Sequence, residues 1–271
     1  MLSKTLNNGQ KIPALGFGTY RLTDPQQVSQ AIRVAIETGY RHFDTADIYG
    51  NHRQLAKAFK QIDLPREELF ITSKIWNSDH GYNNVFRVYD RILNELETDY
   101  LDLFLIHWPG VSRTYLETWQ AMIELYQKGK VRSIGVSNFL VSHLQNLIKH
   151  FDILPAVNQI ELHPYMMDEQ LIKFCSDNQI AVEAWSPIAK GQVATDPLLT
   201  KIGQKYNKTP VQVTLRWHIQ HGFIAIPKSA TPGRIRENFD IWDFELTEHE
   251  MKQIDNLNRF NRIGPDPRHF F

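Results

Sequence analysis

Four side chains near the ends of three strand-like segments could together deliver a proton to a carbonyl oxygen. The carboxylate of Asp44 ends the apolar segment 42–44, and the phenol of Tyr49 follows in the next loop. The ammonium group of Lys74 and the imidazole of His107 end the next two apolar segments. Singly, such residues are usually structural, because a Lys at a strand end is commonly solvated and a lone His is commonly packed. Four complementary groups on neighbouring strands indicate a reactive site.

The chemistry of these four groups predicts a general acid aimed at an oxygen that gains negative charge. A Tyr hydroxyl has a reference pKa of about 10, which is high for proton donation near neutral pH. Lys74 could lower the pKa of Tyr49, provided that Asp44 holds the ammonium in place and charged. His107 could orient the carbonyl oxygen. Because no side chain delivers hydride, such a site requires a cofactor.

The elements that would position these groups alternate regularly along the chain. Expected strands lie at residues 14–17, 42–44, 69–74, 101–107, 131–136, 156–159, 180–184 and 223–226, each followed by helical sequence. The first helix should begin with Asp24 as N-cap and Pro25 as its first residue, and end at Gly39. Eight such units in about 250 residues match an α/β fold of the (β/α)8 TIM barrel type. A doubly wound open sheet is the alternative.

The two ends of the chain depart from this alternation. Residues 5–13 predict a short N-terminal β-hairpin with Asn8-Gly9 as a two-residue turn. Residues 262–271 predict an irregular C-terminal tail. No stretch rich in Ser, Gly or Pro separates two parts of the chain, so residues 1–271 are expected to form a single barrel domain.

Composition narrows the possible partners. The 271 residues contain 30 Lys+Arg and 30 Asp+Glu, which gives no electrostatic argument for nucleic acid or an anionic membrane. Cys175 is the single cysteine, which excludes an intrachain disulfide framework and a Cys-based metal site. We expect no metal and a cytoplasmic location, since a reducing cytosol fits. The start has no signal-peptide core, and no apolar run approaches the roughly 20 residues of a membrane helix.

Later strand ends could hold a nucleotide cofactor. The segment 16–19, Gly-Phe-Gly-Thr, lacks the third glycine of the usual dinucleotide fingerprint. In TIM barrels, phosphate binding tends to use the loops after strands seven and eight together with a helix N-terminus. Lys228, Ser229 and Arg234 lie in such a loop, where Thr231 could be an N-cap and Pro232 the first helical residue. They could hold a monophosphate. Trp185 could stack on a flat ring, and an amide could be bound by Ser137, Asn138 and Gln159.

Ordered segments along nearly the whole chain resemble the aldo-keto reductase family. These segments are residues 16–19, 39–46 with 49–51, 73–76, 105–109, 135–139, 158–164 and 227–229. The resemblance is strongest to a bacterial branch related to 2,5-diketo-gluconate and glyoxal reductases. It implies a TIM barrel, a monomer, and NADPH-dependent reduction of small aldehydes, dicarbonyls or keto-sugars.

The resemblance also implies roles for individual residues. It makes Asp44, Tyr49, Lys74 and His107 a catalytic tetrad with Tyr49 as proton donor. The implied residues for NADPH or NADP+ are Gly18, Thr19, Asp44, Ser137, Asn138, Gln159, Trp185, Ser186, Pro187, Lys228, Ser229, Arg234, Glu237 and Asn238. Of these, Trp185 would stack on the nicotinamide, and Lys228, Ser229 and Arg234 would take the 2′-phosphate and the adenine side. The implied lining of the substrate pocket is Tyr20, Trp76, His107 and Trp108.

Two positions depart from the family pattern, and two other functions stay open. His52 and Ala56 stand where the family usually has Glu and Gly, which affects helix packing more than chemistry. His163 is interpreted as structural. Lys74 could instead be the nucleophile of a Schiff-base lyase, or the chain could be a catalytically quiet NADPH-binding subunit. The complete tetrad favours the reductase.

Overall fold

The computed structural model describes residues 2–110 and 114–270. Eight parallel strands follow one another around a barrel in the order of the chain. They are β3 (Phe17–Gly18), β4 (His42–Asp44), β5 (Phe70–Ile75), β6 (Leu103–Ile106), β7 (Ile134–Ser137), β8 (Val157–Glu161), β9 (Ala181–Trp185) and β10 (Ile224–Ala225). A parallel bridge between Leu15 and Ala225 joins the first strand to the last, and Gly16 N donates to Ala225 O at 2.8 Å. The TIM-barrel prediction is confirmed, and the open-sheet alternative is wrong.

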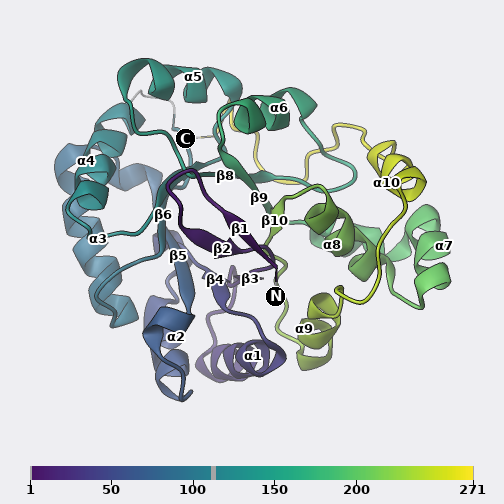
Figure 1. The fold of residues 1–271 in the computed structure, drawn as a ribbon. Coiled ribbons are helices and arrows are strands. Elements are labelled where there is room, and N and C mark those ends of the chain that lie inside the picture. Colours follow the sequence, from purple (N-terminus) through teal and green to yellow (C-terminus); the bar gives the residue numbers. More distant parts are fainter. Residues whose placement is uncertain (1, 111–113, 271) are drawn as a thin grey trace.

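Helices form a ring outside the strands (Figure 1). They are α1 (Pro25–Thr38), α2 (His52–Lys60), α3 (Tyr82–Leu96), α4 (Tyr115–Gln127), α5 (Val141–His150), α6 (Glu169–Asp177), α7 (Pro197–Tyr206), α8 (Pro210–Gln220), α9 (Pro232–Phe239) and α10 (Glu248–Asp255). Single 3-10 turns lie at η1 (Asp47–Tyr49), η2 (Arg66–Glu68) and η3 (Asn77–Asp79), with a longer η4 at Ala189–Thr195. Local sequence fixes the boundaries of α1 as predicted. The Asp24 carboxylate accepts from Gln27 N at 2.8 Å, and Gly39 ends the helix in the left-handed region with φ 119°.

The N-terminal hairpin, β1 (Ser3–Thr5) with β2 (Lys11–Pro13), covers the end of the barrel at which the strands begin (Figure 1). Its Leu6 and Ile12 pack in one buried cluster with residues from the starts of the strands, including Phe70, Leu103 and Val157. This apolar plug fills the amino end of the barrel, which leaves the carboxyl end for polar chemistry.

The turn of the hairpin is longer than predicted. Leu6 N donates to Gln10 O, and Gly9 N donates to Leu6 O, so three residues, 7 to 9, form the loop. Gly9 takes φ 84°, the left-handed conformation that a three-residue hairpin loop needs in its last position. The predicted two-residue Asn8-Gly9 turn is therefore wrong.

Five strands, β3, β5, β7, β8 and β9, extend beyond the ends predicted for them, and two of these extensions concern the site. β5 continues past Lys74 to Ile75, and β8 continues past Gln159 to Glu161. Lys74 and Gln159 therefore project from within strands and are 0% and 2% exposed, instead of lying in solvated turns. After α10 the chain runs without helix or strand to residue 270, as predicted, while Phe271 lies outside the described residues. Among the helices that the structure describes, none is both long enough and apolar enough to span a membrane.

Candidate active site

Asp44 and Lys74 form a buried ion pair at the carboxyl end of the barrel. Lys74 Nζ donates to Asp44 Oδ1 at 2.6 Å and to the Thr45 carbonyl oxygen at 2.8 Å. The two side chains are only 3% (Asp44) and 0% (Lys74) exposed. A carboxylate and a carbonyl around one ammonium favour its charged form. A Schiff-base nucleophile must instead be a neutral amine, so this contact argues against the lyase alternative.

Tyr49 and His107 lie beside this pair. The Tyr49 ring, at the end of η1, has its centroid 5.2 Å from Lys74 Nζ and meets the His107 ring edge-on at 5.8 Å. His107 follows β6 directly, and its buried Nδ1 has no hydrogen-bond partner among the described residues. Burial, and then the charge of Lys74, hold the pKa of His107 well below its usual range. His107 is therefore a neutral imidazole that can donate one N–H to an incoming oxygen.

The pKa of Tyr49 moves in the opposite direction to the sequence-based prediction. Desolvation of the phenol, followed by the charge of Asp44 and the neighbouring Tyr20, raises the pKa of Tyr49 well above 10. Burial is the largest cause, because taking a phenolate out of water is costly and the nearby Lys74–Asp44 pair does not offset that cost. Tyr49 is thus firmly protonated at neutral pH.

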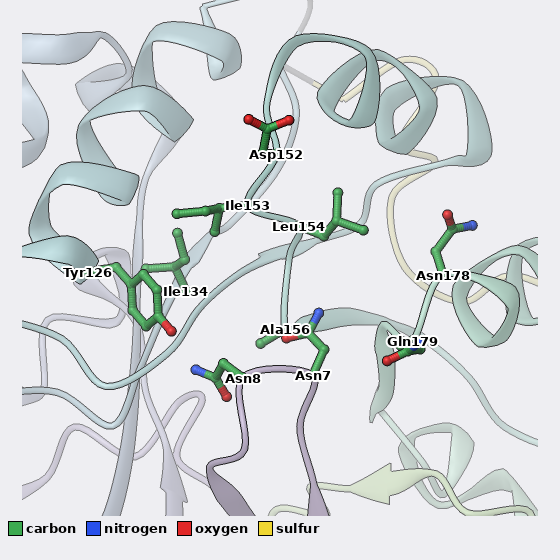
Figure 2. A pocket seen from close by; sticks show the side chains of 10 residues that line it. All are labelled: Asn7, Asn8, Tyr126, Ile134, Asp152, Ile153, Leu154, Ala156, Asn178 and Gln179. Carbon is green, nitrogen blue, oxygen red and sulfur yellow. The ribbon is translucent and has the colours of Figure 1, made fainter.

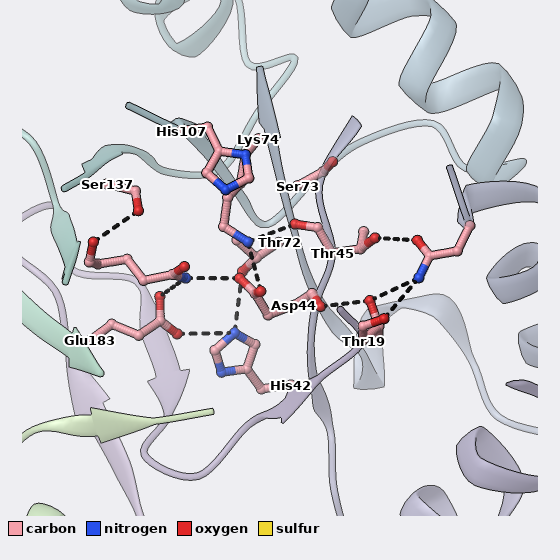
Figure 3. A network of polar contacts seen from close by, with 12 residues as sticks. Thr19, His42, Asp44, Thr45, Thr72, Ser73, Lys74, His107, Ser137 and Glu183 are labelled. Carbon is pink, nitrogen blue, oxygen red and sulfur yellow. Dashed lines mark hydrogen bonds and ion pairs between the residues drawn. The ribbon is translucent and has the colours of Figure 1, made fainter. Parts of the chain in front are cut away.

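A connected set of hydrogen bonds fixes Asp44 from behind (Figure 3). Gln159 Nε2 donates to Asp44 Oδ2 at 2.8 Å, and Thr19 Oγ1 donates to the Asp44 carbonyl oxygen at 2.9 Å. Asn51 ties the surrounding loops together, since its Nδ2 donates to the Thr19 and Leu22 carbonyl oxygens at 3.0 Å each. Thr45 Oγ1 donates to Asn51 Oδ1 at 2.7 Å. Asn51 was visible in the sequence only as part of a motif, without a role.

The residues predicted to bind a carboxamide and a flat ring lie together on β7, β8 and β9. Trp185 Nε1 donates to Asn138 Oδ1 at 2.8 Å, and Asn138 Nδ2 donates to the His107 carbonyl oxygen at 3.0 Å. Ser137 Oγ donates to the Gln159 carbonyl oxygen at 2.9 Å. Both N–H bonds of Gln159 are used by carboxyl groups, so its Oε1 is the atom left to accept from a ligand amide. This donor and acceptor set fits a nicotinamide.

The neighbouring loops bring the backbone close to the same edge. Gly18 N donates to the Pro227 carbonyl oxygen at 3.1 Å, and a Cβ at Gly18 would lie 3.0 Å from the Ile226 carbonyl oxygen. After β9 the chain turns sharply, with Ser186 at φ 50°, and the Pro187 carbonyl oxygen contacts His218 Nε2 at 3.0 Å. These contacts set the loops that flank Trp185.

The loop between β10 and α9 carries the positive charges expected of a phosphate site. Lys228 and Arg234 are exposed, and burial and then the charge of Arg21 lower the pKa of Lys228. Ser229 Oγ accepts from Thr231 N at 3.1 Å. Thr231 is the N-cap of α9, as predicted, but its side chain makes no capping hydrogen bond. The first N–H groups of α9, Lys228 and Arg234 together suit an anion.

The remaining two predicted cofactor residues lie farther along α9. Asn238 is buried, and Glu237 Oε1 accepts from Thr209 Oγ1 at 2.7 Å. The described contacts of Glu237 are thus structural.

Aromatic rings pack beside Tyr49 and His107. The Tyr20 ring lies 5.0 Å from that of Tyr49, and the Trp76 ring lies 5.0 Å from that of His107. Phe270, from the tail, packs 4.3 Å from Trp108 and 6.0 Å from Trp76. Sequence reasoning did not find Phe270, because its distance along the chain from Trp108 gives no periodic signal.

Glu161 anchors the tail over the site. Its Oε1 accepts from His163 Nε2 at 3.1 Å and from Ile263 N at 2.6 Å, and its Oε2 accepts from Gly264 N at 3.0 Å. Burial opposes ionisation, but the bonds from His163 and the tail, with the charge of Arg262, outweigh it and lower the pKa of Glu161. His163 is fully buried in this anchor, in line with a structural role.

Gly264 lets the tail lie directly against Trp185. A Cβ at this position would be 2.2 Å from Trp185 Cη2. We expect Gly264→Ala to displace the tail or the indole, and to lower kcat/KM for carbonyl substrates about tenfold, because small misplacements in an active site are costly. Trp185→Phe removes the obstructing atoms. In that background Gly264→Ala should add little, as measured by steady-state kinetics of the wild type and the three variants; an equal loss in both backgrounds would contradict this contact.

Two further features do not belong to the site. His52, the departure from the family pattern, is buried and contacts Ser73 Oγ at 3.0 Å and Glu95 Oε2 at 3.3 Å, so it joins α2 to β5 and α3. A pocket of about 380 Å³ lies at the opposite end of the barrel (Figure 2). It is lined by the hairpin loop, including Asn7 and Asn8, and by the segments before β8 and β9. It contains none of the four predicted catalytic residues.

Known proteins are similar to this chain in fold and in sequence. The model of the aldo/keto reductase family matches residues 14–259. The 9,11-endoperoxide prostaglandin H2 reductase of Trypanosoma cruzi is 48% identical over 98% of this chain and 95% of its own length. The glyoxal reductase of Bacillus subtilis is 46% identical over 97% and 95%. The aldo-keto reductase of Bombyx mori in complex with NADP has 38% identity and a TM-score of 0.92, over 97% and 95% of the chains. The chain therefore belongs to the aldo/keto reductase family and is an NADP-dependent oxidoreductase that reduces aldehydes or ketones.

Proposed function

We propose that this enzyme reduces small aldehydes and dicarbonyl compounds to alcohols, with Asp44, Tyr49, Lys74 and His107 as its catalytic residues. The observation that best supports these roles is the buried Lys74–Asp44 ion pair with Tyr49 and His107 beside it. Bound NADPH supplies the hydride that the carbonyl carbon takes up. The residues of the chain bind and orient both molecules and supply the proton.

The protonated phenol of Tyr49 donates its proton to the carbonyl oxygen as negative charge develops there. The neutral imidazole of His107 donates a hydrogen bond to the same oxygen and fixes the carbonyl group toward the cofactor. Lys74 lies 5.2 Å from the centre of the Tyr49 ring, where its charge stabilises the phenolate that remains. Asp44 keeps Lys74 charged and in place.

The cofactor would lie across the carboxyl ends of β7 to β10. Asn138, Ser137 and Gln159 would hold the carboxamide, and Trp185 would stack on the nicotinamide ring. Lys228, Ser229 and Arg234, at the start of α9, would take the 2′-phosphate. The backbone at Gly18, Thr19, Ser186 and Pro187 would border the cofactor, with Glu237 and Asn238 near the adenine.

The substrate would be small and not strongly charged. The space in front of Tyr49 and His107 is lined by Tyr20, Trp76 and Trp108, and Phe270 closes it. Such a lining favours compact carbonyl compounds with an apolar face. The Bacillus relative named for glyoxal supports a dicarbonyl substrate. We therefore expect glyoxal, methylglyoxal and small aromatic aldehydes to be reduced.

The proposal extends to the setting of the enzyme. Residues 1–271 would form one barrel domain that acts as a monomer in the cytoplasm. The balanced charge of 30 Lys+Arg and 30 Asp+Glu and the buried, unpaired thiol of Cys175 support a small-molecule enzyme of a reducing compartment.

Loss of NADPH absorbance on addition of methylglyoxal, with NADH assayed in parallel, tests this function. We expect turnover with NADPH and at least about tenfold lower kcat/KM with NADH. The reason is that only NADPH carries the 2′-phosphate that Lys228 and Arg234 would bind. Lys228→Ala should raise the Kd for NADPH roughly tenfold and leave that for NADH nearly unchanged. Equal use of both cofactors would remove the phosphate assignment, and NADPH binding without turnover on any carbonyl compound would contradict the reductase.

A further inference from the structure

Glu183 is a carboxyl group in the centre of the barrel that the proposed mechanism does not use. It is 0% exposed and lies on β9. Its Oε2 accepts from Gln159 Nε2 at 2.8 Å, and the same nitrogen donates to Asp44 Oδ2 at 2.8 Å. This one amide nitrogen therefore joins Glu183 to Asp44, and both carboxyl groups are labelled in Figure 3. Only Gln159 therefore separates Glu183 from the Lys74–Asp44 ion pair, and Gln159 itself belongs to the proposed carboxamide site.

The other carboxyl oxygen of Glu183 is unsatisfied. Oε1 is buried and has no hydrogen-bond partner among the described residues. His42 Nε2 lies 3.5 Å from this oxygen, and His42 in turn contacts Thr72 Oγ1 at 3.2 Å. A buried carboxylate oxygen without a donor is costly, and a protonated carboxyl group at the same place costs less.

The groups around Glu183 leave no positive charge to balance it. Burial brings the pKa of His42 to about 3, and burial holds that of His107 well below its usual range, so both rings are neutral. Lys74 is paired with Asp44. The other elements that pack on β9 are β8, with Gln159 and Glu161, β10, which is apolar, and α6, which presents Leu171 and the neutral Cys175. Glu161 is occupied by the tail.

Charge balance therefore favours a protonated Glu183 beside the Lys74–Asp44 ion pair, whose net charge is zero. Burial, followed by the charge of Asp44, raises the pKa of Glu183 to about 8, although the Gln159 bond and Lys74 partly oppose this. Ionisation of Glu183 would place a second negative charge next to Asp44. Ionisation of Glu183 becomes favourable only if a positive charge enters this end of the barrel.

The cofactor supplies such a charge in one of its two forms, because the nicotinamide ring is neutral in NADPH and positive in NADP+. We propose that Glu183 is a positioning residue whose proton follows the charge of the nicotinamide: its carboxyl group is protonated beside NADPH and ionised beside NADP+. The proton that leaves the carboxyl group is released to the solvent, so no other reactant is needed. This inference rests on the proposed placement of the nicotinamide at Gln159.

The direction of the pH dependence follows from linkage. A nearby positive ring lowers the pKa of Glu183, so NADP+ binds the ionised form more tightly and its affinity rises as pH rises. NADPH affinity does not change through this group. A shift of one unit corresponds to about a tenfold change in affinity. The 2′-phosphate also titrates, but it is common to both cofactors, so the ratio of the two Kd values isolates Glu183.

Calorimetric titration of the whole enzyme with each cofactor, in two buffers of different ionisation enthalpy, counts the protons released. At about pH 7.5 we expect NADP+ binding to release roughly half a proton more than NADPH binding. The Kd ratio of NADP+ to NADPH should fall several-fold between about pH 6.5 and pH 9. In Glu183→Gln, which keeps the shape but cannot ionise, both differences should vanish. Glu161→Gln removes another buried carboxyl group and should retain them.

The outcomes separate this inference from the proposed function. Cofactor binding with equal proton release for NADP+ and NADPH in the wild type would overturn the role of Glu183 and leave the reductase intact. The same follows if Glu183→Gln retains the difference. No binding of either cofactor would overturn both. Infrared difference spectra between the NADPH and NADP+ complexes of the wild type need no variant: the absence of a protonated carboxyl band from the difference would also overturn the inference.

Discussion

Tyr49→Phe is expected to lower kcat for methylglyoxal about a thousandfold while NADPH binds with nearly unchanged Kd. The hydroxyl is the group that donates the proton in the proposed reaction, and a positioned general acid contributes roughly 10²- to 10⁴-fold. The phenyl ring keeps its edge contacts with Tyr20 and His107, so the pocket keeps its shape. Stopped-flow single turnover, with cofactor affinity from quenching of tryptophan fluorescence, separates the chemical step from binding.

Tyr20→Phe is the matched comparison. Its ring lies 5.0 Å from that of Tyr49, but its side chain is largely exposed. Removing this hydroxyl should act mainly on KM and change kcat far less than Tyr49→Phe does. Undiminished turnover in Tyr49→Phe would remove Tyr49 from the mechanism. A covalent adduct at Lys74, trapped with borohydride and substrate, would favour the lyase.

Asp44→Ala should abolish activity and also destabilise the fold by about 3 kcal/mol, because it leaves a buried ammonium without its counter-ion. Lys74 is 0% exposed and would keep only the Thr45 carbonyl as a partner. Chemical denaturation of the variant and the wild type measures the lost free energy of unfolding.

The double variant Asp44→Ala/Lys74→Met removes both charges. It should recover much of the lost free energy of unfolding, since replacing a buried pair by apolar groups is often nearly neutral, yet it should remain inactive. If the double variant is as unstable as Asp44→Ala, the loss comes from the cavity or from Gln159, which also loses an acceptor. That result would contradict the electrostatic explanation.

The sequence allowed the fold to be predicted because its signals are local. The N-cap Asp24, Pro25 and the left-handed Gly39 mark α1 without reference to any other part of the chain. The prediction of the hairpin turn was wrong because Asn8-Gly9 and Asn7-Asn8-Gly9 are both favourable turn sequences. The pairing of Leu6 with Gln10 decides between them. Lys74 and Gln159 were placed at strand ends because polar residues usually terminate buried strands, whereas here they project into the barrel.

The site was predictable where residue type alone limits the chemistry, as for Asp44, Lys74, Tyr49 and His107. What the sequence could not reveal depends on distances. Glu183 is a single carboxylate in an apolar strand, and only the approach of Gln159 and Asp44 shows that it is a buried neighbour. The predicted direction of the Tyr49 pKa was wrong for the same reason, because it depends chiefly on how deeply the phenol is buried.

The contact between the first and last strands, which we call the seam of the barrel, has a consequence for folding during synthesis. The Leu15–Ala225 bridge joins residues near opposite ends of the chain, and the site straddles this seam, with Asp44 on one side and Lys228 on the other. A nascent chain that has emerged only as far as β9 carries the whole proposed tetrad but cannot close the ring. Closing so long a loop is entropically costly and slow. Activity should therefore arise late in synthesis, when β10 is released from the ribosome and docks beside the first strand.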